Sequence, residues 1–391
     1  MGVYCWPSTE RSGVFSGALD PVVLGQHLSR EQRLEGLDAE QLVSPRDDAI
    51  RVGGAGAREP APTSTRAPTH TAKFSVSLWF ELREAGGVSD LPEDPPGIAA
   101  GPLIWVDDRD DPRLGLYRDL NDPAARIRLV GDESVFVVEG RLAVERLLSS
   151  VYTVHSLLVD DHQVTAAGDL VAATRARGAS VFVGSRALVA STVGFALHRG
   201  VVAVANRPSP ADAQQILADA AGKSAPEGAP PIVAVLEGLN DHENIGSLFR
   251  NAAAFGVAGV LLDPTCADPF YRRSIRVSVG HVLHMPFARL VPWPTGLQLV
   301  RAAGFVVAAL TPRPAADCGV PAVSLAELKA AIPGSDHPVG VALLVGAEGP
   351  GLTEMALAAS DVMVSIPIVD RIDSLNVATA AAIAFHALAC L

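Results

Sequence analysis

The chain has 391 residues, of which 49% are hydrophobic and 19% are charged, so it holds enough apolar material for two ordinary domains. Its formal net charge of −12 argues against a general polyanion-binding protein, for which a basic face is expected, although a local basic site stays compatible with it. Nearly all of the positive charge is arginine, because lysine occurs only at Lys73, Lys223 and Lys329.

The cysteines form neither a disulfide framework nor a metal site, because they are far apart and lack ligand spacing; they are Cys5, Cys266, Cys318 and Cys390. The small number and wide spacing of the cysteines favour a reducing, cytoplasmic setting. No N-terminal segment has the apolar run and flanks of a signal peptide, and the most apolar stretch, residues 377–391, is too short to span a bilayer. We therefore expect a soluble protein without a metal.

Residues 1–95 differ from the rest of the chain, because they are rich in Gly, Pro, Ala and Thr and show weak hydrophobic periodicity. We expect this stretch to be disordered or loosely attached, or to be an extension that is not part of the natural protein. From residue 102 to about 207, strand patterns alternate with helix patterns, as in "VFVVEGRLAVERLLSSVYTVHSLLVDD". This alternation predicts a small α/β domain, followed by a Pro-rich linker over residues 208–230.

Residues 231–391 alternate again, with short apolar strands in "PIVAVL", "AGVLLD", "GFVVAALT", "VGVALLVG" and "DVMVSIPI". Helices are expected over residues 244–255, where apolar residues follow the helical period, and over residues 377–388. Short all-apolar strands joined through helices predict a parallel sheet with helices on both faces.

Three loops of this second region are more polar than plain connectors need to be. In the first, Asn244 is at the expected N-cap of a helix, Gly246 allows a close turn, and Arg250 follows six residues later. Ligands of α/β sheets lie beyond the carboxyl ends of strands, beside helix N-termini, so these residues are candidates for a site. The alternative is that Asn244 only caps the helix and that Arg250 is a surface cation.

The second loop, "GAEGPGL", contains Gly346, Glu348, Gly349 and Gly351, so its backbone can approach a ligand closely. It matches neither the usual dinucleotide motif nor the P-loop motif. Glu348 has a structural alternative, as an acid favoured in the first turn of a helix. The third loop holds Asp370, Asp373, Ser374 and Asn376 between a strand and the last helix, and capping explains only one of these.

Together, the three loops resemble the motifs of the SpoU/TrmH family of RNA ribose 2′-O-methyltransferases, a branch of the SPOUT class. The family patterns N-x-G-x-x-x-R-x-A-x-x-x-G, G-x-E-G-x-G-L and I-P-M followed by S-L-N-V-A-x-A correspond to "NIGSLFRNAAAFG", "GAEGPGL" and "IPIVDRIDSLNVATAA". The visible departure is Ile368 in place of Met, a swap that conserves volume. The resemblance covers residues 232–391. With lower specificity, "FVVEGRLAVERLL" and "ALHRGVVAVA" are similar to the L30e-like RNA-binding domain that precedes many family members.

The resemblance implies a trefoil knot, a homodimer with active sites built from both chains, and S-adenosylmethionine as the cofactor. By position it implies a cofactor pocket made by Leu310, Thr311, Gly346, Ile366 and Leu375. It implies a catalytic group made by Arg250, Asn244, Glu348, Ser374 and Asn376. Arg250 has been considered a general base in the family, yet arginine normally stays protonated, so a phosphate grip or alkoxide stabilisation is the alternative.

RNA binding is expected at the basic run "YRRSIR", with Arg272, Arg273 and Arg276, and at His198 and Arg199 in the first domain. The last helix is a candidate dimer interface, with ordinary core packing as the alternative. We expect ribosomal RNA rather than tRNA as the substrate, because of the leading L30e-like domain. A non-catalytic RNA-binding protein with the same fold is the competing interpretation; the presence of both Arg250 and Asn376 argues against it.

Overall fold

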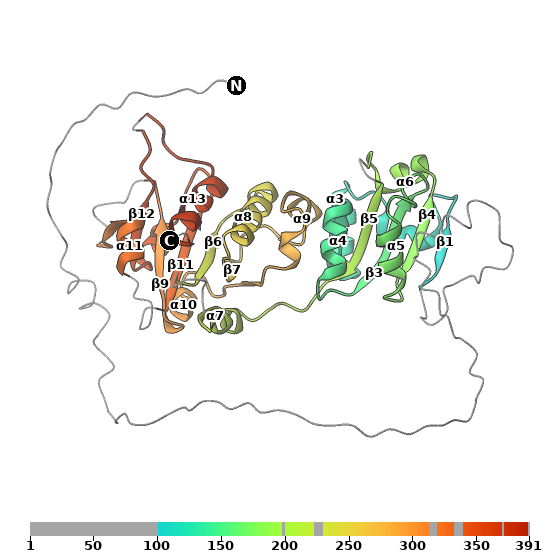
Figure 1. Ribbon diagram of the computed structural model, residues 1–391. Coiled ribbons are helices and arrows are strands. Elements are labelled where there is room, and N and C mark those ends of the chain that lie inside the picture. Colours follow the sequence, from blue (N-terminus) through green and yellow to red (C-terminus); the bar gives the residue numbers. More distant parts are fainter. Residues whose placement is uncertain are drawn as a thin grey trace, which may run out of the picture. The chain divides into compact units, whose positions relative to one another are not determined.

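The computed structural model describes residues 101–197, 200–222, 230–312, 319–331, 339–369 and 371–389 (Figure 1). The predictions for residues 1–95, for His198 and Arg199 and for Asp370 therefore lie outside the described residues. The described chain forms two sheets, one of five strands and one of seven. No helix in the described part is long and apolar enough to cross a membrane.

The first sheet is mixed and has the strand order β1-β4-β3-β5-β2. Strands β1, β4 and β3 pair in parallel, whereas β5 runs antiparallel to both β3 and β2. Its strands are β1 (Leu103–Trp105), β2 (Val135–Glu139), β3 (Val154–Asp160), β4 (Ser180–Gly184) and β5 (Val201–Asn206). Its helices are η1 (Pro112–Tyr117), α3 (Pro123–Ile127), η2 (Arg128–Asp132), α4 (Arg141–Ser149), α5 (Gly168–Arg175) and α6 (Arg186–Val193).

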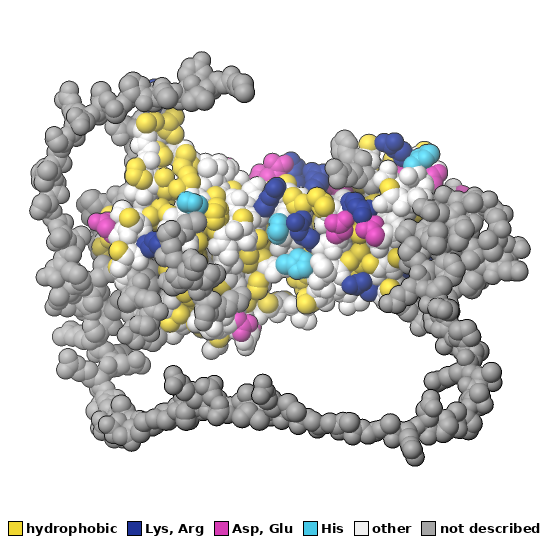
Figure 2. Space-filling view, viewed as in Figure 1, with side chains coloured by type: hydrophobic (Ala, Val, Ile, Leu, Met, Phe, Trp, Pro, Cys, Tyr) yellow, Lys and Arg dark blue, Asp and Glu magenta, His cyan; other side chains and the backbone are white. Residues whose placement is uncertain are grey.

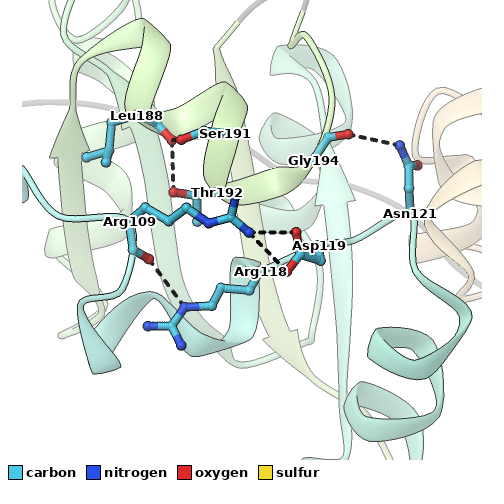
Figure 3. A network of polar contacts seen from close by, with 8 residues as sticks. All are labelled: Arg109, Arg118, Asp119, Asn121, Leu188, Ser191, Thr192 and Gly194. Atoms are coloured by element: carbon cyan, nitrogen blue, oxygen red, sulfur yellow. Dashed lines mark hydrogen bonds and ion pairs between the residues drawn. The ribbon is translucent and has the colours of Figure 1, made fainter.

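The segment before β2, whose sequence suggested no function, covers one face of this sheet. Tyr117 at the end of η1 is fully buried, and its hydroxyl lies 2.8 Å from Oγ of Ser156 on β3. In Figure 3, Arg109 pairs with Asp119 within the segment at 3.0 Å, and Asn121 donates to the carbonyl of Gly194 at the end of α6. The segment is therefore an integral layer of the first sheet's core.

The second sheet is entirely parallel and has the strand order β10-β12-β9-β11-β6-β7-β8. The chain runs outward from β6 to β8, then crosses to β9 and returns to place β11 between β9 and β6. The direction of winding thus changes at β6 and β11, where α/β sheets bind ligands. The strands are β6 (Ile232–Glu237), β7 (Gly259–Leu262), β8 (Phe287–Arg289), β9 (Phe305–Leu310), β10 (Ala322–Ser324), β11 (Gly340–Gly346) and β12 (Val362–Ser365).

Helices cover both faces of the second sheet. Buried residues of α8 (His242–Ala254), α11 (Leu325–Ala331) and α13 (Val377–Ala389) belong to one core cluster, and those of α7 (Ala213–Ala221), α10 (Leu297–Ala302) and α12 (Glu354–Ala358) belong to the other. Helix α9 (Arg272–Val277) and the short helix η4 (His281–Leu283) follow β7. The predicted fold class, a parallel sheet covered on both faces and preceded by a smaller α/β domain, is confirmed.

An aromatic cluster joins the two sheets. The rings of Phe136 on β2 and Phe270 before α9 stack at 4.7 Å, and Tyr152 meets Phe270 edge-on at 5.3 Å. Beside them Arg207 pairs with Asp268. Because aromatic side chains bury large areas, this contact holds the first sheet against the start of α9.

Candidate active site at the carboxyl edge of the parallel sheet

A cavity of about 440 Å³ opens at the carboxyl ends of β9, β11 and β12. The five residues expected to form the cofactor pocket all line it: Leu310, Thr311, Gly346, Ile366 and Leu375. Leu352 and Ile368 add apolar surface, and Glu348, Ser374 and Asn376 add polar groups. The structure thus brings residues from three separate strand ends into one cavity.

The glycine loop after β11 folds back on itself against this cavity. A Cβ atom at Gly346 would lie 2.5 Å from the carbonyl carbon of Gly351 and 2.5 Å from the nitrogen of Leu352. Gly351 itself has φ +73°, and it forms an isolated antiparallel bridge with Ala347. Only glycine fits at position 346, because a side chain would collide with backbone atoms.

The side chain of Asn376 connects the three polar loops. Its Nδ2 donates to Oδ1 of Asn244 at 2.9 Å and to Oε1 of Glu348 at 2.7 Å. Its Oδ1 accepts from the backbone nitrogens of Ala378 and Thr379, at 3.0 and 3.1 Å, and so caps α13. The cap fixes the orientation of the carboxamide, because only its oxygen can accept these bonds.

A second cavity, of about 620 Å³, lies beyond the ends of β6 and β7. It shares a wall with the first cavity, and the residues that line both are Ala347, Glu348, Gly351 and Val377. Its lining includes the carboxylates of Glu237, Asp241 and Asp263 as well as Asn244, but no lysine, arginine or histidine among the described residues. Glu348 therefore stands between a mainly apolar cavity and one rich in hydrogen-bond acceptors.

Sequence reasoning did not find Glu237, a residue of the second cavity. Glu237, the last residue of β6, is buried and accepts from Nε1 of Trp293 at 2.7 Å and from the backbone nitrogen of Thr353 at 2.9 Å. It thereby joins β6 to the start of α12. The available signal was a glutamate that directly continues a fully apolar strand, since a buried carboxylate needs partners.

Two details predicted for the first loop are wrong. The N-cap of α8 is Asp241, which accepts from the backbone nitrogens of Glu243 and Asn244, and not Asn244. Asn244 lies inside the helix, so its side chain is free to meet Asn376. Gly246 makes no turn; it lies in α8, where a Cβ atom would come within 2.6 Å of the carbonyl oxygen of Ser274. Its role is the close packing of α8 on α9.

Arg250 lies apart from the other candidate catalytic residues. It is exposed on α8 and lines neither cavity. It comes six positions after Asn244, which places it about 120° away around the helix axis. The structure therefore brings Asn244, Glu348 and Asn376 together, with Ser374 on the wall of the first cavity, and leaves Arg250 on a different face.

The basic run on α9 is largely paired within the chain. Arg272 pairs with Glu139 on β2 at 3.2 Å and also donates to Asn121, while its guanidinium lies 4.6 Å from the Phe195 ring centroid. Arg276 meets the same Glu139 at 3.4 Å, and Arg273 pairs with Glu243 at 2.5 Å. In the described conformation two carboxylates thus offset part of the charge of these three arginines.

A parallel sheet with a ligand cavity at its switch point, beside a small mixed-sheet domain, defines a two-domain α/β protein that acts on a bound ligand. The family model described as "SpoU rRNA Methylase family" matches residues 231–386. An uncharacterised tRNA/rRNA methyltransferase of Mycobacterium tuberculosis strain H37Rv is 44% identical over 281 residues, which cover 72% of this chain and 90% of that protein.

Solved structures of similar fold include an rRNA methyltransferase from Sinorhizobium meliloti, with a TM-score of 0.57 and 25% identity over 74% of this chain and 98% of that chain. The SpoU methyltransferase AviRb from Streptomyces viridochromogenes, in complex with AdoMet, has a TM-score of 0.56 at 23% identity and covers 71% of this chain and 98% of its own. The chain belongs to the SpoU family of RNA methyltransferases, whose members methylate ribose 2′-hydroxyls with S-adenosylmethionine as the cofactor.

The first cavity fits such a cofactor. Its volume is within the usual range of small-molecule sites, and its apolar side chains alternate with the exposed backbone of the glycine loop. The missing Cβ at Gly346 lets the loop fold back against its own backbone at Gly351 and Leu352, which shapes this wall of the cavity.

Proposed function

We propose that this chain methylates a ribose 2′-hydroxyl of ribosomal RNA at the wall between the two cavities. The observation that carries the proposal is the Asn376 carboxamide, which joins Asn244, Glu348 and the start of α13. The network consists of two side-chain hydrogen bonds and a helix cap. Together they hold three polar side chains close to one another. Positioning of this kind is what a methyl transfer needs from a protein.

The cofactor would lie in the first cavity, where Leu310, Ile366 and Leu375 offer apolar surfaces for a flat base and the loop at Gly346 offers backbone groups. When bound, S-adenosylmethionine supplies a methyl group already activated by its positive sulfonium. The protein then needs no metal to activate the leaving group.

The ribose would approach from the second cavity, across Glu348. Because the described lining of that cavity contains carboxylates and no cations, a phosphate is disfavoured there, whereas a sugar hydroxyl or a base edge finds acceptors. Oε1 of Glu348 accepts from Asn376, and Oε2 has no partner among the described residues, so it can accept a hydrogen bond from the 2′-hydroxyl. Asn376 would thus orient Glu348 and Asn244 toward the ribose.

Arg250 would serve the site of a second copy of the chain. It lines neither cavity of its own chain, and apolar side chains stand exposed near the first cavity and on the last helix, with Val369 at 58%, Ile372 at 46% and Ile383 at 40% exposure. A second chain would cover these groups and would bring its own Arg250 to the ribose. As a protonated guanidinium, Arg250 would stabilise the developing alkoxide or hold a neighbouring phosphate.

Co-expression of two inactive variants tests this arrangement. Arg250→Ala and Asn376→Ala homodimers should both be inactive, whereas their mixed dimer contains one complete site if Arg250 acts on the partner's cavity. Random pairing would then restore about a quarter of wild-type methyl transfer. No recovery, with mixed dimers demonstrably formed, would place Arg250 in its own chain's site.

Ribosomal RNA is proposed over tRNA because a mixed-sheet domain, consistent with an L30e-like RNA-binding domain, precedes the methyltransferase region, and because a solved structure of similar fold is described as an rRNA methyltransferase. Incubation with radiolabelled S-adenosylmethionine and, separately, unmodified ribosomal RNA or tRNA distinguishes the two. Label confined to the tRNA pool would overturn the proposed substrate and leave the proposed reaction intact.

A further inference from the structure

The arginines expected to hold RNA phosphates on α9 share two carboxylates, because Arg272 and Arg276 both pair with Glu139 and Arg273 pairs with Glu243, so other cations of the described chain deserve comparison. Figure 2 shows basic and histidine side chains gathered on one face, over the region where Figure 1 draws α8, α9 and α4. Four cationic or titratable side chains in this region form no ion pair among the described residues: Arg146, Arg250, His281 and His284.

Hydrogen bonds hold these groups in place across the contact between the two sheets. Arg146 on α4 donates through Nη1 to the carbonyl of Val279, just before η4. His284, directly after η4, lies with Nε2 at 2.9 Å from the carbonyl of Arg146 and at 3.3 Å from Oγ of Ser149. The first domain thus supplies Arg146 and the methyltransferase region supplies the histidines.

The backbone between α9 and η4 is shaped for this contact. Gly280 has φ +84°, and a Cβ atom there would lie 3.0 Å from Cα of Ala143 and 3.2 Å from Cβ of Arg146. Val279 has φ +54°, an uncommon backbone conformation for a β-branched residue. Helix α8, which carries Arg250, packs against η4 from the other side. The close approach therefore fixes Arg146, His281 and Arg250 around one short segment.

The charges in this cluster repel one another without compensation. Burial lowers the pKa of His281, and the neighbouring Arg146, Arg250 and His284 lower it further, while no carboxylate opposes the shift. Positive charge without a carboxylate partner attracts anions, even in a chain of net charge −12. Arg146 differs in this respect from Arg141 on the same helix α4. Arg141 pairs with Glu145 at 3.0 Å and with Asp169 at 2.6 Å.

We propose that Arg146, Arg250, His281 and His284, here called the basic junction, bind consecutive phosphates of the RNA substrate. The inference rests on the proposed function. The RNA strand would leave the methylation site beside Arg250 and continue over η4 onto α4, so that both domains grip one backbone. Phosphate contacts of this kind set the register of the RNA without reading its sequence.

Filter binding of an unmodified large-subunit ribosomal RNA transcript tests the basic junction, because backbone contacts do not require the exact target sequence. The double variant Arg146→Gln, His284→Gln should bind about tenfold more weakly, with a shallower salt dependence between roughly 50 and 200 mM. Arg141→Gln is the matched control on the same helix, and it should bind within about twofold of wild type because its charge is already neutralised. Arg146→Lys should restore most of the affinity lost in Arg146→Gln.

Equal losses in Arg146→Gln and Arg141→Gln would overturn the proposal, and so would an Arg146→Lys variant as weak as Arg146→Gln. Cofactor binding, measured by calorimetry, should stay unchanged in all variants, which shows that the methyltransferase region is still folded. If wild type and the control bind RNA as expected but no protein transfers a methyl group, the proposed function fails while the basic junction stands.

Discussion

At the scale of the residue, the account depends most on Asn376. Both ends of its carboxamide are used: the oxygen caps α13 and the nitrogen binds Asn244 and Glu348. The sequence pattern indicated that capping explains only one of Ser374 and Asn376, and the structure makes Asn376 that cap; its further role was implied by the family resemblance. The sequence could not predict the bond to Asn244, since the two residues are far apart in the chain and meet only through the winding of the sheet.

Replacing Asn376 with Ala should lower the rate of methyl transfer about 100-fold, because Asn244 and Glu348 lose the group that orients them. The lost helix cap should reduce the free energy of unfolding by about 1 kcal/mol. Asp212→Ala removes a cap of the same kind from α7, where the Asp212 side chain accepts from the backbone nitrogen of Gln214 at 2.9 Å. The control should lose comparable stability and keep its rate; equal rate losses in the two variants would show that Asn376 is only a cap.

Replacing Gly346 with Ala should abolish measurable cofactor binding, because the added methyl group collides with the backbone at Gly351 and Leu352 and pushes the glycine loop out of place. Titration calorimetry with S-adenosylhomocysteine measures the effect. Gly168→Ala, at the start of α5, is the matched control, since nothing lies within 4 Å of its Cβ. Unchanged binding by Gly346→Ala would mean that this cavity is not the cofactor site.

At the scale of the element, helix starts and short strands were the least predictable parts. The stretch "LNDHEN" offers Asn240, Asp241 and Asn244 as possible caps, and only tertiary packing decides that α8 begins after Asp241. Strands β1, β8 and β10 have three residues each, too few to show a period, so the sequence did not reveal them. The long apolar strands were predictable because burial on both faces leaves a continuous apolar run.

The trefoil knot stays a prediction. The strand order shows that β11 inserts between β9 and β6 and that β12 inserts between β9 and β10, so the chain returns twice into a sheet that is already partly formed. Threading of a loop is too rare to infer from strand order alone.

Replacing Gly246 with Ala should destabilise the packing of α8 on α9, because the new Cβ would meet the carbonyl of Ser274 and the side chain of Val277. We expect a loss of roughly 1–3 kcal/mol in the free energy of unfolding, measured by urea denaturation. Gly222→Ala, at the end of α7, is the comparison, since its Cβ would make only ordinary contact, at 3.6 Å from the carbonyl of Ala218. Equal stability of the two variants would contradict the close helix contact.

At the scale of the whole molecule, RNA binding by α9 stays a prediction, and the structure adds how its arginines are paired. Acidic composition and the run "YRRSIR" suggested α9, yet Glu139 pairs with both Arg272 and Arg276 across the contact between the sheets. That pairing joins residues more than a hundred positions apart, so no local pattern could reveal it. The same contact explains the segment before β2, which packs into the first sheet and brings Asn121 to Arg272.

RNA affinity should rise as pH falls through and below about 6.5, the ordinary pKa of histidine. His281 has a pKa below its ordinary value of 6.5 in the free protein, because burial and the charges of Arg146, Arg250 and His284 disfavour its protonated form. Phosphates at the basic junction favour that form, so RNA binding takes up a proton below the ordinary pKa. In the absence of RNA the effect on the free energy of unfolding is unfavourable: because the folded-state pKa of His281 is lowered, this free energy should fall as pH drops below about 6.5.

Binding titrations across this pH range, with His281→Gln beside wild type, measure the effect. The His281→Gln variant should show a weaker pH dependence, whereas His162→Gln, which changes an exposed histidine beside Asp161, should behave as wild type. A pH dependence identical in all three proteins would remove His281 from the RNA surface.

The measurement that bears most directly on the central claim is the position of the transferred methyl group. Ribosomal RNA labelled by the enzyme from radioactive S-adenosylmethionine would be hydrolysed in alkali, which cleaves every phosphodiester next to a free 2′-hydroxyl and spares those next to a methylated one. We predict that the label is recovered in alkali-resistant dinucleotides and disappears when Asn376→Ala replaces wild type. Label in mononucleotides would mean that a base is methylated, and it would contradict a ribose site between the two cavities.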